Sequence, residues 1–336
     1  MKFVKFFSLL FLTTALTFIF LFFNKVYAQS VSLSLSPPLL EVFIKPGKTI
    51  MVAYNLQNYG DPVICQAKVL PFEPKDNYGN IRIRSEFEGP IRFSLDNADL
   101  KLDQPFFLKS KGRQQILLRL RVPERAPEGD YYYTLLVETQ PPPVNEGKAS
   151  GRAKVTIGSN ILVTVTGSET VQIKGKIALF DVLPRFKLNL GFGELKIFDS
   201  NDKIPVVAVV ENQGRNFIKP EGEIILRGNF GETAKYNILP QNILSQSQRL
   251  LSATPSAQID CGNEKKMPIF CQKPVSLLLS GFFIGKYNLS LSIFFGENTP
   301  KLFASTSFIA LPFKLIFGFL IALFIAFFII KKISND

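Results

Sequence analysis

Between residue 31 and about residue 310 the chain alternates apolar and polar side chains with a period of two. In the segment 115–122, Ile116, Leu118, Leu120 and Val122 alternate with polar residues that include Arg119 and Arg121. Alternation of this kind places every second side chain on the same face of a β-strand, so it predicts a strand with one buried face. The same pattern recurs over 49–57, 131–137 and 161–165.

Turn signals separate these segments, for example Lys45-Pro46-Gly47 and Glu128-Gly129-Asp130. Short strands at regular spacing predict an all-β protein built from antiparallel, immunoglobulin-like sandwiches. About 280 residues are too many for one ordinary sandwich, so we expect two domains in series. A polar junction at Gly167–Thr170 divides them, which predicts a first sandwich over 30–167 and a second β-sandwich over 168–310.

The N-terminal segment has the order of a secretory signal peptide. Lys2 and Lys5 precede a long apolar run, and Ala28 supplies a small residue before Gln29. This pattern predicts a signal peptide over 1–28 and export of the chain. The alternative is an uncleaved anchor, because the apolar run is long for a signal peptide.

The C-terminal segment predicts a membrane anchor. The run 315–330 carries no polar side chain, and the twenty residues 311–330 would span roughly 30 Å as a helix, which matches a bilayer core. Lys331 and Lys332 follow, so we expect a cytoplasmic tail over 331–336 and a single-pass protein of the plasma membrane with its ectodomain outside the cytoplasm.

Small residues recur on one face of this predicted helix, at Gly318, Ala322 and Ala326. Such spacing allows a second helix to approach closely. The alternative is chance, because Gly and Ala are common in membrane helices.

The composition limits the chemistry. The chain contains no His, which excludes His-activated serine or cysteine nucleophiles and His-ligated zinc. No motif indicates a catalytic constellation, a cofactor, a metal site or nucleic-acid binding, so we expect a binding protein rather than an enzyme. The whole chain has a formal net charge of +12, and without residues 1–28 and 313–336 it keeps 33 bases and 26 acids, a net charge of +7. A mildly basic ectodomain suits an anionic neighbourhood such as a cell wall or lipid surface, although a solvated lysine-rich surface explains it equally.

Three cysteines are present. Cys261 and Cys271 lie close in sequence in a segment expected outside the cell, so we predict a disulfide between them. Cys65 is left over in a strand-like segment, and a buried free thiol is the simplest interpretation.

Basic side chains on outward strand faces are the candidate contacts for an anionic wall polymer. Arg119 and Arg121 share one face, as do Arg82 and Arg84, and Tyr132 could stack on a sugar. Binding through these residues would weaken as salt rises. The alternative is that the arginines only keep a sheet face soluble.

Several segments together resemble a known family. Residues 37–58 read PPLLEVFIKPGKTIMVAYNLQN, residues 105–138 read PFFLKSKGRQQILLRLRVPERAPEGDYYYTLLVE, and a C-terminal apolar helix follows. In this order they resemble the bacterial WxL-interacting proteins. The resemblance implies a chaperone-like immunoglobulin domain associated with peptidoglycan, a second sandwich that holds a secreted surface protein, and one membrane helix.

The sequence thus favours a membrane-anchored cell-surface adhesion or scaffold protein that binds wall polymer, another surface protein, or both. One alternative is a surface glycan hydrolase, which would need two carboxylates about 5–10 Å apart in a concave site. A second is a membrane-tethered assembly chaperone, which would need an exposed, long, apolar edge strand for strand addition.

The position of signal cleavage is directly testable. We expect the mature chain to begin at Gln29, because Val26 and Ala28 stand at the −3 and −1 positions. N-terminal sequencing of the protein from its native host should read Gln-Ser-Val. A stable product that keeps residues 6–23 would instead indicate a second membrane passage.

Overall fold

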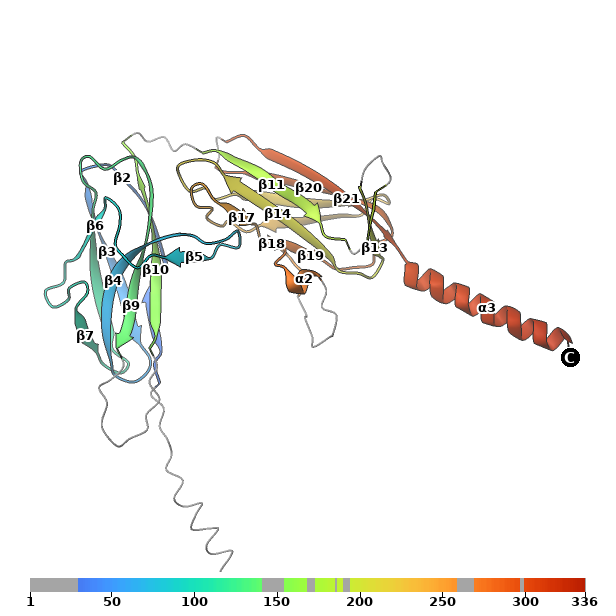
Figure 1. The fold of residues 1–336 in the computed structure, drawn as a ribbon, viewed down its shortest axis with the longest axis horizontal. Helices are drawn as coiled ribbons and strands as arrows, with labels where there is room; N and C mark the ends of the chain where they lie inside the picture. The colour runs from blue at the N-terminus through green and yellow to red at the C-terminus, as the bar shows by residue number, and fades with distance from the viewer. Residues whose placement is uncertain are drawn as a thin grey trace, which may run out of the picture.

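The computed structural model describes residues 30–140, 154–167, 173–184, 186–189, 194–258, 269–296 and 299–335. These residues form two β-sandwiches followed by a helix that extends away from the second sandwich (Figure 1). The strands of the two sandwiches run in different directions, so the outer face of one sheet of the first sandwich meets the end of the second (Figure 1).

The first sandwich comprises β1 to β10. One sheet has the order β1-β3-β8-β6, with β1 at Leu33–Ser36, β3 at Thr49–Asn58, β8 at Arg113–Arg121 and β6 at Arg92–Leu95. The facing sheet has the order β2-β10-β9-β4-β5, and β7 also pairs with β4. Its strands are β2 (Leu39–Ile44), β10 (Thr156–Val165), β9 (Gly129–Gln140), β4 (Val63–Pro74), β5 (Ile81–Ile83) and β7 (Pro105–Leu108).

The first strand of the chain crosses from one sheet to the other. β1 pairs antiparallel with β3, whereas β2 pairs parallel with β10. Pro37 and Pro38 lie between them and have no N–H to donate, so sheet pairing is interrupted at this point. The crossing ties both sheets together and makes β2 an edge strand beside the second sandwich.

The second sandwich comprises β11 to β21. Its smaller sheet has the order β11-β14-β17, with β19 also paired to β14, and its larger sheet has the order β12-β13-β21-β20-β15-β16-β18. The strands are β11 (Gly175–Val182), β12 (Phe186–Asn189), β13 (Glu194–Asp199), β14 (Ile204–Asn212), β15 (Glu221–Gly228), β16 (Thr233–Ile238), β17 (Gln248–Leu250), β18 (Ala253–Thr254), β19 (Leu277–Leu279), β20 (Gly285–Phe294) and β21 (Leu302–Leu311), with the short helix α2 (Ile269–Gln272) before β19.

Each sandwich encloses its own apolar core, as the period-two pattern predicts. In β8 and just beyond it, Ile116, Leu118, Leu120 and Val122 are all fully buried. They pack in one cluster with residues of the facing sheet such as Leu135. The second core gathers residues of β14, β15 and β20 in the same way. Burial of these faces supplies the main free energy that holds each sandwich together.

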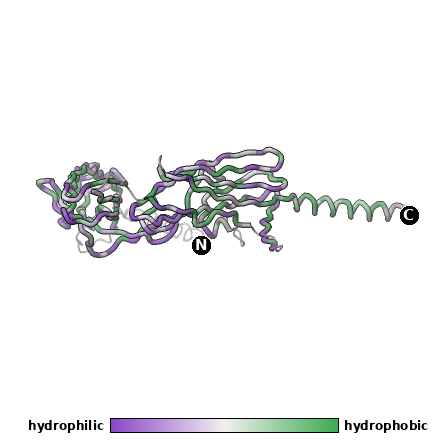
Figure 2. Tube along the Cα trace, turned by 90° about the horizontal axis from the view of Figure 1, so that it is seen from above, coloured by the Kyte–Doolittle hydropathy of each residue, from purple (hydrophilic) through white to green (hydrophobic). Residues whose placement is uncertain are grey.

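The C-terminal helix α3 spans Phe313–Asn335. It begins two residues after the predicted start, because Leu311 is the last residue of β21. Apolar residues run along it (Figure 2), and the side chains described from Phe313 to Phe327 are all exposed. Gly318, Ala322 and Ala326 therefore pack against no other described element of this chain, and their role in helix pairing stays a prediction.

Within the part of the chain that the structure describes, no helix is both long and apolar enough to cross a membrane. The transmembrane helix that the sequence predicts over 311–330 therefore stays a prediction.

The predicted signal peptide over 1–28 and Cys261 lie outside the described residues, as does most of the loop at 140–151. Cys271 is a bonded cysteine, but its pairing with Cys261 stays a prediction. Cys65 is a free thiol buried in β4, as expected.

The burial of Cys65 has a measurable consequence. Burial raises the pKa of its thiol to about 11, so at pH 8 the reactive thiolate is scarce as well as inaccessible. We expect a thiol reagent to label Cys65 about 100-fold more slowly in the native protein than in urea. The Cys65→Ala variant should lose this labelling. Rapid labelling of the native thiol would contradict its place in the core.

Candidate functional site

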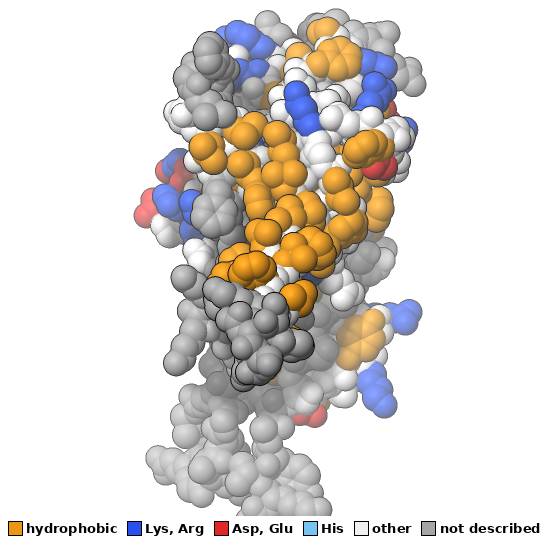
Figure 3. Space-filling view, turned by 90° about the vertical axis from the view of Figure 1, so that its right-hand side faces the viewer, with side chains coloured by type: hydrophobic (Ala, Val, Ile, Leu, Met, Phe, Trp, Pro, Cys, Tyr) orange, Lys and Arg blue, Asp and Glu red, His pale blue; other side chains and the backbone are white. Residues whose placement is uncertain are grey.

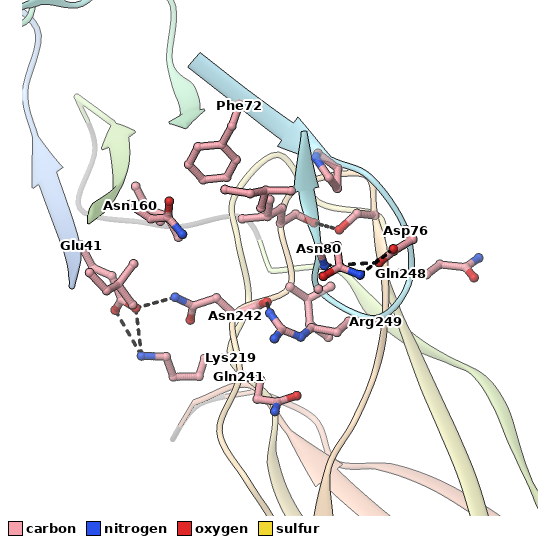
Figure 4. Close-up of a pocket in the computed structure, with 18 of the residues that line it drawn as sticks. Glu41, Phe72, Asp76, Asn80, Asn160, Lys219, Gln241, Asn242, Gln248 and Arg249 are labelled. Atoms are coloured by element: carbon pink, nitrogen blue, oxygen red, sulfur yellow. Dashed lines mark hydrogen bonds and ion pairs between the residues drawn. The ribbon is translucent and has the colours of Figure 1, made fainter. Parts of the chain in front are cut away.

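A cavity lies between the two sandwiches (Figure 4). The outer face of β2 and β10 forms one wall, and the loop 240–249 of the second sandwich forms the opposite wall. The third wall is a hairpin arm, residues 71–84, which β4 and β5 extend from the first sandwich toward the second (Figure 1). We call this space the interdomain cleft. Its volume is about 340 Å³.

The carboxylate of Asp130 joins the two sandwiches beside the cleft. Its Oδ1 accepts hydrogen bonds from Thr164 Oγ1 at 2.8 Å and from Asn216 Nδ2 at 2.9 Å. Its Oδ2 accepts from the Tyr132 hydroxyl at 3.0 Å and from the backbone N–H of Phe217. Two donors belong to the first sandwich and two to the second, so one ionised group orients both. Hydrogen bonds to a charged acceptor are about twice as strong as neutral ones.

Tyr132 does not lie on an open sheet face, as the sequence led us to expect. It points away from the first core, but the second sandwich covers that face. Its ring stacks on Phe72 with centroids 5.8 Å apart, and its hydroxyl accepts a hydrogen bond from Ser245 N–H at 2.8 Å. Burial and the charge of Asp130 raise the pKa of Tyr132, so the phenol stays neutral. Tyr132 therefore fastens the sandwiches together and is not available to stack on a sugar.

An ion pair between Glu41 and Lys219 also joins the two sandwiches, along β2. Glu41 lies 3.1 Å from the ammonium of Lys219 and also accepts a hydrogen bond from the side-chain amide of Asn242. Close by, the rings of Phe43 and Phe217 are in contact, with centroids 6.3 Å apart. Edge strand β2 is thus held by the second sandwich through both charge and apolar contact.

The turn of the hairpin arm is organised by Asp76. Its carboxylate accepts hydrogen bonds from Tyr78 N–H at 2.9 Å, Asn80 N–H at 3.2 Å and Asn80 Nδ2 at 2.8 Å. The amide of Asn80 contributes most to holding the pKa of Asp76 below its ordinary value. The tip then reaches the second sandwich, where Asn77 C=O accepts from Leu250 N–H at 2.7 Å.

Arg249 brings a positive charge into the cleft. Its Nη1 donates to the backbone carbonyl of Asn242 at 2.7 Å, while burial lowers the pKa of its guanidinium. Its Nε and the Oδ1 of Asn242 are buried and have no hydrogen-bond partner among the described residues. Gly79 lies directly over the guanidinium, where an added Cβ would come within 2.5 Å of its carbon. The cleft therefore contains one cationic donor and one amide acceptor that protein groups leave unsatisfied.

The arginines predicted to contact an anionic polymer do not line the cleft, and they form two separate pairs. Arg84 pairs with Glu73 at 2.8 Å and Glu88 at 2.7 Å, and Arg82 lies 3.6 Å from Glu73. Arg119, in the opposite sheet, bonds Asp96 at 2.6 Å. These acidic partners, which the sequence did not reveal, offset most of the local positive charge.

Arg121 has an exposed side chain, and no ion pair is found for it among the described residues. It lies in β8, opposite Thr49 of β3 and Arg92 of β6. The structure thus places Arg119 and Arg121 on one sheet and Arg82 and Arg84 at the margin of the other, and does not bring the two pairs together.

A surface glycan hydrolase would need paired carboxylates in the cleft, one of them with a raised pKa. The two carboxylates of the cleft, Glu41 and Asp76, are each held by several donors. A general acid needs a raised pKa, but every acid with a resolved shift in the described chain has its pKa lowered. These acids are Asp76, Glu138, Asp181, Asp199 and Glu211.

Several edge strands give little room for strand addition, although β11, an edge of the smaller sheet of the second sandwich, is eight residues long and has Leu179 exposed. In the described chain β1, β6, β7 and β12 are each only four residues long. The longer edge strand β2 has exposed apolar side chains at Leu39 and Phe43, but it faces the second sandwich. The condition for strand addition, a long and open apolar edge, is therefore not met by β1, β2, β6, β7 or β12.

Comparisons with known proteins find no matching family model and no matching curated sequence. Among solved structures, the class 5 fimbriae chaperone CfaA is 9% identical over 83% of this chain and 99% of its own, with a TM-score of 0.36. The Escherichia coli chaperone DraB is 13% identical over 83% and 98%, with a TM-score of 0.36. PapD-like domain 7 of human CEP192 is 18% identical over 41% and 87%, with a TM-score of 0.27. At these values the likeness carries no argument about function, which we take from the cleft itself.

Removal of the Asp130 carboxylate tests the junction. We expect Asp130→Ala to lower the free energy of unfolding by about 2–4 kcal/mol, since donors on both sandwiches lose a charged acceptor. Urea denaturation would measure the loss, and small-angle scattering should show a wider distribution of interdomain arrangements. The control is Asp96→Ala, which removes an exposed ion pair and should cost at most about 1 kcal/mol. Equal effects of the two changes would contradict the role of Asp130.

Proposed function

We propose that this chain is a membrane-anchored scaffold of the cell surface that holds a segment of another secreted protein in its interdomain cleft, without catalysing a reaction. The observation that carries this proposal is the lining of the cleft, where five side-chain amides and Arg249 lie among apolar side chains.

The lining of the cleft suits an extended polypeptide. Side-chain amides can both donate and accept hydrogen bonds, as a peptide backbone requires. Those that line the cleft are Asn80, Asn160, Gln241, Asn242 and Gln248, and apolar side chains between them can receive the side chains of a peptide, namely Leu39, Ile81, Leu162, Ile243 and Leu244. A volume of about 340 Å³ lies at the lower end of the usual range for binding sites and would take a short segment.

Arg249 gives this site a preference for an acidic ligand. A partly desolvated guanidinium favours a carboxylate, because the two groups form charge-assisted hydrogen bonds of matching geometry. The segment we propose therefore presents an acidic group to Arg249. The arginines suggested for a wall polysaccharide lie on the sheet faces, and most of them have acidic partners.

Anchoring follows from the two ends of the sequence. The proposed signal peptide directs export, and α3 with the lysines that follow its apolar residues would hold the second sandwich at the membrane. This arrangement agrees with the resemblance to the WxL-interacting proteins, and we propose membership of that family on the order of the segments quoted above.

The cleft can be tested by charge removal. The ectodomain, residues 29–310, would be incubated with the secreted and wall-bound proteins of its own host. We expect it to retain a protein partner, and Arg249→Gln to weaken that binding about 10- to 100-fold, since it removes a charge-assisted contact. Binding would be quantified with the purified partner by calorimetry.

The matched control is Arg121→Gln, which removes an arginine from an exposed sheet face. It should leave binding to the partner unchanged, and both variants should melt near the wild-type temperature. If Arg249→Gln binds as well as the wild type, the cleft is not the binding site. Retention of wall polysaccharide alone, weakened by Arg121→Gln, would favour the sheet face instead.

A further inference from the structure

We propose that the end of the second sandwich from which α3 departs rests in the headgroup layer of a lipid membrane, through exposed apolar side chains on its loops. The inference deepens the proposed function and rests on its anchoring by α3. It concerns a surface separate from the interdomain cleft, and it fixes how the second sandwich stands on the membrane.

The first residue of the proposed membrane contact is Phe230, at the tip of the turn between β15 and β16. Its side chain is 75% exposed. Its backbone N–H donates to Glu232 Oε2 at 3.1 Å, and Gly231 next to it has φ +90°. Turn tips of this kind usually carry small polar residues. An exposed phenylalanine at the tip of such a turn is unfavourable in water, and contact with an apolar surface would lower its free energy.

The second contact is the loop between β19 and β20. Phe282 and Ile284 are 54% and 41% exposed, whereas Phe283 between them is 7% exposed and packs in the core. Gly281 and Gly285, at φ +155° and +92°, bracket the three residues. The core thus fixes Phe283, and the alternation of an extended chain forces its two neighbours outward.

Both loops lie at the same end of the sandwich as the start of α3. In the sheet register Gly228 of β15 lies opposite Tyr287 of β20, and Gly285 lies opposite Ala310 of β21. An added Cβ on Gly285 would lie 3.5 Å from the ring of Phe230. Figure 3 views the molecule from this side, so α3 points toward the viewer and its hydrophobic side chains fill much of the middle of the view, with lysines and arginines around them.

The first turn of α3 is fastened to this end of the sandwich. The backbone N–H of Lys314 donates to Asp199 Oδ2 at 3.1 Å, and its ammonium lies 3.3 Å from Asp202 Oδ1. Ser200 N–H donates to the carbonyl of Leu311 at 3.1 Å. The apolar surface of the helix therefore continues directly into the exposed side chains of Leu311 and Phe313 and the loops beside them.

A lipid surface fits this chemistry better than a protein partner does. Aromatic residues are favoured at the membrane–water interface, where an apolar ring meets polar headgroups. The patch is continuous with a helix whose apolar side chains are exposed on every side, and such a helix is covered by lipid when it anchors a protein. Exposed cations near the patch, Arg227 and Lys286, would meet phosphate groups.

The chain contains no tryptophan, so the fluorescence of a single introduced tryptophan reports only on the position of that residue. The full chain with Phe230→Trp or Phe282→Trp would be reconstituted in phosphatidylcholine vesicles with and without lipids brominated on their acyl chains. We expect brominated lipid to quench either tryptophan about threefold more than it quenches one placed at the opposite end of the sandwich. Soluble iodide should instead quench the tryptophan at the opposite end more strongly than those at 230 and 282.

The matched control is Phe303→Trp. Phe303 is 73% exposed, close to Phe230, but lies at the far end of β21, where Leu302 pairs with Ile293. A second control, Phe319→Trp, reports on α3 itself. Quenching by lipid at 319 without quenching at 230 and 282 would overturn this inference and keep the anchor. Absence of lipid quenching at all three positions would overturn both. Quenching at 230 and 282 together with position 319, and not at 303, supports the inference.

Discussion

The arrangement of the two sandwiches depends on one carboxylate. Asp130 stands at the start of β9, where its two oxygens accept hydrogen bonds from Thr164 and Tyr132 on its own sandwich and from Asn216 and Phe217 on the other. Each sandwich has a complete core of its own, so apolar burial alone would leave their relative position open. The shared acceptor restricts that position together with the contacts of Glu41, Tyr132 and Asn77, and these contacts bring the walls of the cleft together.

The strands were predictable because each depends on neighbours in sequence. Alternation identified the inner face of β8, and all of its inward residues are buried. The cleft was not predictable in this way, because its walls bring Glu41, Asn80 and Arg249 together from distant segments. In the sequence, nothing distinguishes them from other polar residues on solvent-exposed faces. The one local signal was the Gly129-Asp130-Tyr131 start of a strand, which marks a turn but does not say that its carboxylate bridges two domains.

The positive charges on the strand faces do not by themselves identify a binding face. The four arginines on strand faces look like a cationic surface, but three of them lie beside carboxylates from turns or neighbouring strands, namely Glu73, Glu88 and Asp96. Exposed pairs of this kind contribute little to stability and lower the field that a distant anion would feel. Arg249 is the opposite case, since it is a single charge without a carboxylate partner among the described residues, in a place from which water is partly removed.

The connection between β21 and α3 also determines how the molecule would bear a mechanical load. A pull on a ligand in the cleft, resisted by an anchor at the C-terminus, would reach the membrane through β21. That strand lies inside its sheet, paired with β20 from Leu302 to Ala310 on one side and with β13 on the other. Tension along β21 would act parallel to its neighbours, and all its interstrand hydrogen bonds would resist together instead of opening one after another. In the proposed scaffold, β21 would therefore carry the load between the ligand and the anchor.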